Sequence, residues 1–197
     1  MGQNNVNLAA LIGSRICHDL ISPIGAINNG LELLGMASSQ DGPEIELISE
    51  SVENASARIR FFRIAYGAAS AQEMGRAEVV SILKDVTRGG RLNVAYGPLD
   101  AQPRWAVRMA FLAIQCLETS MPFGGRIEVN CDAGNWTITG HSPKLNVDAG
   151  LWALVDGAEA QDLAPAHVQF ALLPAVAEDA ARRLSSAVAA EAITVRF

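Results

Sequence analysis

The feature that most constrains the fold is an apolar stripe with helical spacing that runs through most of the first 66 residues. Apolar side chains recur at steps of three or four from residue 8 to 36 and again from residue 44 to 66. These positions are Leu8, Ile12, Ile16, Leu20, Ile24, Ile27, Leu31 and Leu34, followed by Ile45, Ile48, Val52, Ala55, Ile59, Phe62 and Tyr66. Turn-forming residues at 38–43 separate the two runs. The pattern predicts two long amphipathic helices joined as an antiparallel hairpin.

A single hairpin of this kind has more apolar surface than it can bury. Each helix carries its own stripe, and one hairpin cannot cover both of them. We therefore expect residues 1–75 to form a homodimer, in which the hairpins of two chains build a four-helix bundle.

After residue 75 the pattern changes to a mixture of helical and strand periods, which predicts a second unit over residues 76–197 and an α+β fold for the whole chain. Helices are expected at 77–88, at 103–120, and through Phe170, Leu173 and Val176. Strands are expected at 92–96, in a hairpin at 127–131 and 136–138, and in two short segments that end at 193–197. Residues 142–165 are expected to be rich in loops.

The composition excludes several classes of function. Half of the 197 residues are hydrophobic and the formal charge is −6, so the chain can fill a core but lacks a basic cluster for a nucleic-acid backbone. No apolar stretch is long enough to span a membrane. Cys17, Cys116 and Cys131 are too widely spaced for a thiolate zinc site or a disulfide framework, which favours a reduced, cytoplasmic protein.

The candidate reactive residue is His18. At about 100° per residue, His18 lies about 180° from the centre of the apolar stripe and shares its face with polar or small residues. An exposed imidazole offers a neutral nitrogen as nucleophile at neutral pH, although an ordinary surface histidine is the alternative. Pro23 inside the helix costs about 3 kcal/mol. With Gly25 it predicts a bulge or kink that makes room for another protein, or else a tolerated kink.

Residues 18–24, His-Asp-Leu-Ile-Ser-Pro-Ile, resemble the phosphoacceptor box of histidine kinases, which usually reads His-Glu-Leu-Arg-Thr-Pro-Leu. Ile21 departs from that box, because kinases usually have a basic residue there. The order of a helical hairpin followed by a mixed region is also similar to these kinases. The resemblance implies a dimeric four-helix bundle followed by an α/β sandwich like the kinase ATP-binding domain.

Three parts of a kinase nucleotide site are missing from the second region. The Gly-Gly-Arg-Ile segment at 124–127 sets a register that puts Cys116 where kinases have the asparagine that helps to hold magnesium, and a thiol is a poor magnesium ligand. Residues 139–142 lack the acidic loop that reads adenine, and residues 164–169 lack the glycines of the phosphate-cradling loop. We therefore expect a degenerate ATPase-like domain, and a chain that binds no cofactor or metal of its own.

An intact acceptor histidine beside a degenerate nucleotide domain resembles the ChpT-type histidine phosphotransferases of alphaproteobacterial cell-cycle phosphorelays, closely so over residues 17–30. The resemblance implies that His18 receives phosphate from a receiver-domain aspartate of a hybrid sensor kinase and passes it to the aspartate of a response regulator. The receiver domain is expected to bring Mg²⁺. Two alternatives stay open: a divergent ATP-dependent sensor histidine kinase, and a non-catalytic dimeric scaffold or inhibitor of a kinase.

The neighbours of His18 are given supporting roles. Asp19 can hydrogen-bond the second ring nitrogen and set the tautomer and orientation of the imidazole, or can hold a group of the partner. Arg15, one turn earlier, can neutralise phosphate charge. For both residues the alternative is an ordinary surface charge. The residues expected to line the face where a receiver docks are Arg15, Ser22, Gly25 and Asn29.

Overall fold

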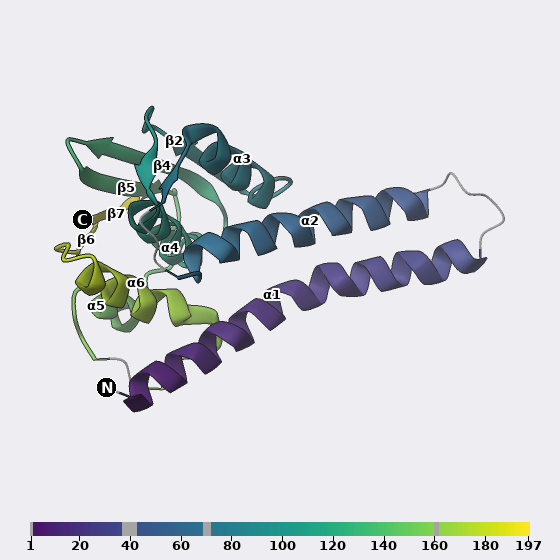
Figure 1. Cartoon of the computed structure of the whole chain (residues 1–197), viewed down its shortest axis with the longest axis horizontal. Helices are drawn as coiled ribbons and strands as arrows, with labels where there is room; N and C mark the ends of the chain where they lie inside the picture. Colours follow the sequence, from purple (N-terminus) through teal and green to yellow (C-terminus); the bar gives the residue numbers. More distant parts are fainter. Residues whose placement is uncertain (1, 37–42, 69–71, 160–161) are drawn as a thin grey trace.

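The computed structural model describes residues 2–36, 43–68, 72–159 and 162–197, and its first two elements are long helices (Figure 1). Helix α1 (Gly2–Met36) and helix α2 (Pro43–Ala65) lie side by side and run in opposite directions. Pro43 and the acidic Glu44 and Glu46 suit the start of α2, because a first-turn proline loses no hydrogen bond and carboxylates favour a helix N-terminus. The predicted hairpin is confirmed, whereas most of its predicted turn falls on residues 37–42, outside the described residues.

Helix α1 is continuous through Pro23, so the predicted bulge or kink does not end the helix. Pro23 itself is buried. Further along, the two helices approach each other closely at Gly30, where an added Cβ atom would lie 2.5 Å from Cγ1 of Ile48. The absence of a side chain at Gly30 therefore lets α1 and α2 pack tightly near the tip of the hairpin.

The second unit contains the predicted helices and strands together with one helix that the sequence pattern missed. The confirmed elements are α3 (Arg76–Val86), β2 (Leu92–Tyr96), α4 (Arg104–Ser120), β4 (Gly125–Asp132), β5 (Asn135–His141), α6 (Val168–Asp179), β6 (Ser185–Val188) and β7 (Ala192–Arg196). The loop prediction for 142–165 is wrong at α5 (Ala149–Val155). Asp148 caps this helix, since its Oδ1 accepts hydrogen bonds from the amides of Gly150 at 2.9 Å and Leu151 at 3.2 Å.

The main sheet has five strands in the order β2-β4-β5-β7-β6. Strands β2 and β4 pair in parallel, and the other neighbours pair antiparallel. Along β4, Ile127 and Val129 are buried while Arg126 points to solvent, as expected for a sheet with one covered face. The short strand β1 (Glu73–Met74) pairs with β3 (Gln102–Pro103), which ties the end of the first predicted unit to the second. The division of the chain at residue 75 stays a prediction.

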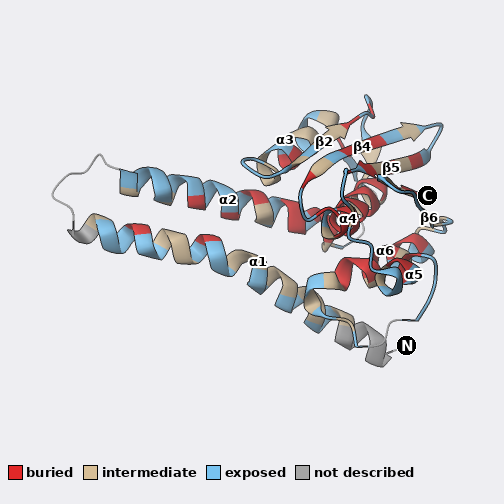
Figure 2. Ribbon diagram, turned by 180° about the vertical axis from the view of Figure 1, so that it is seen from behind, coloured by how far each residue is buried: buried red, intermediate tan, exposed pale blue. Residues whose placement is uncertain are grey.

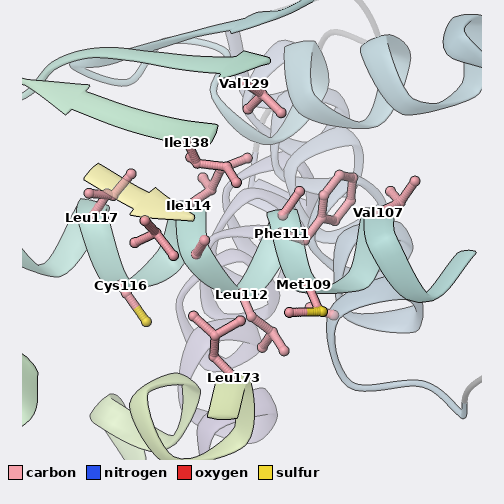
Figure 3. Packing of buried hydrophobic residues seen from close by; sticks show 14 of the residues in the cluster. Val107, Met109, Phe111, Leu112, Ile114, Cys116, Leu117, Val129, Ile138 and Leu173 are labelled. Atoms are coloured by element: carbon pink, nitrogen blue, oxygen red, sulfur yellow. The ribbon is translucent and has the colours of Figure 1, made fainter. Parts of the chain in front are cut away.

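Helix α4 lies at the centre of the core, and 12 of its 17 residues are buried (Figure 3). Its side chains lie between the sheet, represented by Val129 and Ile138, and Leu173 of α6. The hairpin shares this core, because Phe61 of α2 stacks on Phe111 of α4 with ring centroids 4.6 Å apart, a pairing worth about 0.5–1.5 kcal/mol. The two predicted units therefore form one packed body.

The apolar stripe of α1 divides into two parts with different surroundings (Figure 2). The first half packs against the shared core through Leu8, Ile12, Ile16 and Leu20. The second half lies beyond the second unit, and there Ile24 and Leu31 are exposed. A stripe of α2 on Ile45, Val52 and Ile59, spaced seven residues apart, is exposed as well.

Candidate functional site

His18 lies on α1 where that helix passes the second unit, and its side chain is 80% exposed. Ser14 and Ser22, one helical turn before and after it, are also exposed. The helical angle predicted from the apolar stripe is thus confirmed: the imidazole points away from the core. An incoming group reaches this ring without any movement of the fold.

One ring nitrogen of His18 is held from within the protein. Nδ1 lies 3.1 Å from Oδ1 of Asp19, whose side chain is only 11% exposed. An ionised carboxylate can only accept, so Nδ1 carries the proton in this hydrogen bond. The lone pair of the neutral ring is then on Nε2. The pair therefore presents a nucleophilic nitrogen to solvent.

The carboxylate of Asp19 is in turn held by two arginines. Nε of Arg15 donates to Oδ2 of Asp19 at 2.9 Å, and Nη1 of Arg58 on α2 lies 4.0 Å from the same oxygen. Nη1 of Arg15 also donates to the backbone oxygen of Ala166, 151 residues further along the chain. Arg15 is only 18% exposed. The structure thus turns Arg15 inward to Asp19 and Ala166, away from the solvent where a phosphoryl group on His18 would lie.

The other predicted docking residues lie on an open face beside His18. Ser22 and Asn29 are exposed, and, apart from the adjoining residues and backbone of α1 itself, no described atom lies within 4 Å of the position that a Cβ on Gly25 would take. Ile21, at the position where the kinase box has a basic residue, is 70% exposed. Along this face of α1, the surface beside the imidazole therefore consists of small or uncharged polar residues and one exposed apolar side chain.

The segments that the resemblance to histidine kinases matches to nucleotide-binding parts are packed against the core in this structure. Cys116 is buried within α4, and burial raises the pKa of its thiol well above the ordinary value. Figure 3 shows its sulfur on the side of α4 that faces α6. At the position of the adenine-reading loop, Gly140 is buried so tightly that an added Cβ would lie 2.8 Å from Sδ of Met121. Ser142 is buried and its hydroxyl donates to the backbone oxygen of Gly124 at 2.9 Å.

The segment at the position of the phosphate-cradling loop forms the 3-10 helix η1 (Pro165–His167) and the first turn of α6. Gln169 and Phe170 of this turn are fully buried. Nε2 of Gln169 donates to the hydroxyl of Thr119 on α4 at 3.0 Å, and Phe170 meets Trp152 of α5 edge to face at 5.5 Å. These contacts hold the first turn of α6 directly against α4 and α5.

Comparison with known proteins agrees with this geometry. A family model described as "Histidine phosphotransferase C-terminal domain" matches residues 76–192. Protein phosphotransferase ChpT of Brucella abortus (strain 2308) is 33% identical over 196 residues, which cover 95% of this chain and 93% of that protein. The chain belongs to the histidine phosphotransferase family.

A solved structure also supports the assignment of this chain to the histidine phosphotransferase family. The structure described as "1.7 Angstrom Structure of a Bacterial Phosphotransferase" has a TM-score of 0.80 and 31% identity, over 97% of this chain and 95% of that one. The predicted ChpT-type relationship and the predicted α+β fold are both confirmed. Among the described residues of the phosphotransferase, no three His, Cys, Asp or Glu side chains form a cluster that could hold a metal ion. No described helix is long and apolar enough to cross a membrane.

Sequence reasoning missed the residues that support Asp19 from other elements of the phosphotransferase. Arg58 and Ala166 come close to the site only through tertiary packing. Glu118 of α4 lines the same hollow as Arg15, Asp19 and Arg58. Although part of Glu118 reaches solvent, burial around its carboxyl raises its pKa, while nearby Arg15 and Arg58 oppose the rise. The helical spacing of Arg15 and Asp19, four residues apart, is the one sequence signal that pointed to this network.

Proposed function

We propose that this phosphotransferase is a relay carrier, in which His18 accepts a phosphoryl group from the aspartate of a receiver domain in a hybrid sensor kinase. His18 then passes the group to the aspartate of a response regulator. The observation that carries the proposal is an exposed imidazole whose Nδ1 is engaged by Asp19, while its Nε2 has no hydrogen-bond partner among the residues that the structure describes. The filled nucleotide positions favour a protein that takes phosphate from another protein.

The phosphoryl transfer is a displacement at the phosphorus atom. The Nε2 lone pair forms the new P–N bond while the bond from phosphorus to the aspartyl oxygen breaks, and the donor carboxylate leaves with that electron pair. The proton stays on Nδ1, where Asp19 accepts its hydrogen bond and stabilises the positive charge that develops on the ring. The second transfer reverses these steps on another carboxylate. Because such transition states are loose, orientation and charge neutralisation supply most of the rate.

We assign the remaining charge neutralisation to the partner. Mg²⁺ prefers several oxygen ligands, and a receiver domain with an acidic pocket would supply both the ion and those ligands. On this proposal His18 and Asp19 of this chain contribute the nucleophile and its orientation, and the face with Ser22, Gly25 and Asn29 receives the partner. A cytoplasmic location stays the prediction made from the sequence.

We also propose that the working form is a homodimer. The exposed side chains Ile45, Val52 and Ile59 repeat every seven residues on α2, and Ile24 and Leu31 do so on α1. Such a repeat is typical of helices that pack against partner helices in a bundle. By helical angle the Ile24–Leu31 face lies about 120° or more from His18, so dimerisation through it leaves the imidazole accessible.

The decisive experiment incubates the full chain with a receiver domain carrying labelled aspartyl phosphate. We expect label on the chain that is stable to base and labile to acid, as phosphohistidine is, and its loss in His18→Ala. His141→Ala, which removes an exposed histidine of β5, is the matched control and should still accept label. Label that persists in His18→Ala would refute the proposal.

The same assay separates the two alternatives. A divergent kinase would label itself from ATP in the absence of any receiver. A scaffold would take up no label while still binding its partner equally well with and without the His18 side chain. Either result would replace the relay carrier as the function of this chain.

A further inference from the structure

Arg15 joins the phosphoacceptor region to the second unit in a way that its expected role as a phosphate-binding residue does not explain. Its guanidinium has two partners on opposite sides: Nε donates to Asp19, and Nη1 donates to the backbone oxygen of Ala166 in η1. A row of contacts therefore runs from His18 through Asp19 and Arg15 to η1. This last segment is the one that stands at the position of the lost phosphate-cradling loop.

The surroundings of Arg15 separate this contact from an ordinary surface pair. The side chains of Arg15 and Asp19 are 18% and 11% exposed, whereas exposed pairs four residues apart on a helix contribute only a few tenths of a kcal/mol. Besides Asp19, the titratable and charged groups facing Arg15 are Arg58 and Tyr66 and, on α4, Glu118.

Tyr66 shows how closed this environment is. Burial raises its pKa to about 12, the positive charge of Arg15 opposes that rise, and its hydroxyl donates to Oε1 of Gln115 at 3.1 Å. The Arg15 guanidinium therefore lies among packed groups from several elements, where the position of each partner is set by the fold.

We propose that Arg15 is a positioning residue through which η1 of the degenerate domain fixes Asp19, and thereby the orientation and tautomer of His18. The inference rests on the proposed function, because it concerns the reactivity of the same imidazole. The planar guanidinium suits this task, since it donates in two directions at once from one rigid group. Lysine at this position would keep the charge but would offer one ammonium to either partner.

The effect on rate follows from the geometry. Displacement of a reacting group by about 1 Å can cost about 100-fold in rate, even when the change lies outside the reacting atoms. Without Arg15, the one cation among the described residues that still approaches the Asp19 carboxylate, apart from the His18 ring itself, is Arg58. Its Nη1 lies 4.0 Å away and its Nε is already bonded to Oδ1 of Asn54 at 2.9 Å. We expect about a 10-fold or greater loss of the single-turnover transfer rate in Arg15→Gln, and a smaller loss in Arg15→Lys.

The test pairs that rate with a direct reading of the imidazole. ¹⁵N NMR of labelled full-length protein distinguishes the two neutral tautomers, and no partner is needed for the measurement. We expect His18 to populate mainly the tautomer with the proton on Nδ1 in the wild type, and to lose that preference in Arg15→Gln. Arg88→Gln is the matched control, because Arg88 also links the hairpin to the second unit, through Glu53 and Asp85, but away from His18. It should change neither reading.

Each outcome decides the inference. If Arg15→Gln keeps the wild-type transfer rate and the wild-type tautomer of His18, the inference is overturned. A slower rate with an unchanged tautomer would also overturn it, because Arg15 would then act on the docked partner or on folding. If the wild-type chain accepts no phosphate, the proposed function fails, while the tautomer still decides whether Arg15 positions His18. Should Arg15→Gln fold poorly by circular dichroism, Arg15→Lys provides the same two readings.

Discussion

The packing of α6 against α4 allows us to predict how a substitution of Gln169 changes the free energy of unfolding. This residue is fully buried at the contact of α6 with α4, its Nε2 donates to Thr119, and its Oε1 has no hydrogen-bond partner in the described part of the chain. The hydroxyl of Thr119 already donates to the backbone oxygen of Gln115 at 3.0 Å, so it can only accept from Gln169. The observed orientation leaves Oε1 unpaired, and turning the amide would leave both of its ends unpaired, because Thr119 can then donate to neither.

Gln169→Leu is therefore expected to stabilise the protein. The change loses one neutral hydrogen bond, worth about 1 kcal/mol, and removes a buried unpaired carbonyl, which costs about 1–3 kcal/mol. Leucine is similar in size, so little cavity or strain is expected. The net expectation is a free energy of unfolding that rises by about 0–2 kcal/mol, which corresponds to an increase in Tm of several degrees at most in a chain of about 200 residues.

Urea denaturation followed by circular dichroism measures this change, and an unaltered slope against denaturant shows that the folded and unfolded states remain comparable. Thr119→Val provides the contrast. It leaves both ends of the Gln169 amide unpaired and should destabilise the protein by about 1–3 kcal/mol, an effect that disappears largely in the double variant with Gln169→Leu. A loss of more than about 1 kcal/mol in Gln169→Leu alone would refute the reasoning, because Oε1 would then have to be satisfied.

Three further predictions concern other surfaces. Val52→Glu should convert the proposed dimer to a monomer in analytical ultracentrifugation without loss of helical signal, because Val52 is 47% exposed within one chain. Asp85→Asn should lower the free energy of unfolding by about 0.5–1 kcal/mol at pH 7. The hydrogen bond from Arg60 lowers the folded pKa of Asp85, so the stabilisation is present above the unfolded pKa of about 4 and is lost as pH falls through the folded pKa, where urea melts of the two proteins should coincide. Gly25→Leu should slow phosphotransfer at least about 10-fold by filling the open face beside the acceptor, whereas Gly13→Leu, the same change on another side of α1, should not.

The helices and strands were predictable where one strong period dominates. Apolar steps of three and four fix α1, α2 and α4, and alternation fixes β4 and β5, because each pattern matches only one backbone geometry. Helix α5 was missed because its seven residues are too few to establish a period, although Asp148 before Ala149 is a recognisable N-cap. The periodicity of α1 could not show that the two halves of its apolar stripe have different surroundings. Ile16 packs on the core of the second unit, whereas Ile24 is exposed.

In the candidate site too, some features could be predicted from the local sequence, whereas others depend on residues far away in the chain. The outward direction of His18 follows from helical angle alone. Its contact with Asp19 does not follow in this way, because side chains one residue apart on a helix do not face each other. The direction of Arg15 does not follow either, because a long side chain on the border of a helix face can turn either to solvent or to the protein. The tertiary hydrogen bond to the backbone oxygen of Ala166, 151 residues further along the chain, is what turns Arg15 toward the protein.

The contact between Arg15 and Ala166 connects the altered segment around η1 with the arrangement of His18. Burying Gln169 and Phe170 between α4 and α5 holds the first turn of α6 against the core, and η1 precedes this turn directly in the chain. The carbonyl of Ala166 is thereby brought to α1, at the level of Arg15. A mobile, glycine-rich loop at the same position would lack this fixed seat, because glycine carries no side chain to bury and costs more conformational entropy to order. The packing of α6 on α4 and α5 thus also supplies a rigid support beside His18, through Ala166 and Arg15, which gives a physical reason to retain the second unit in this phosphotransferase.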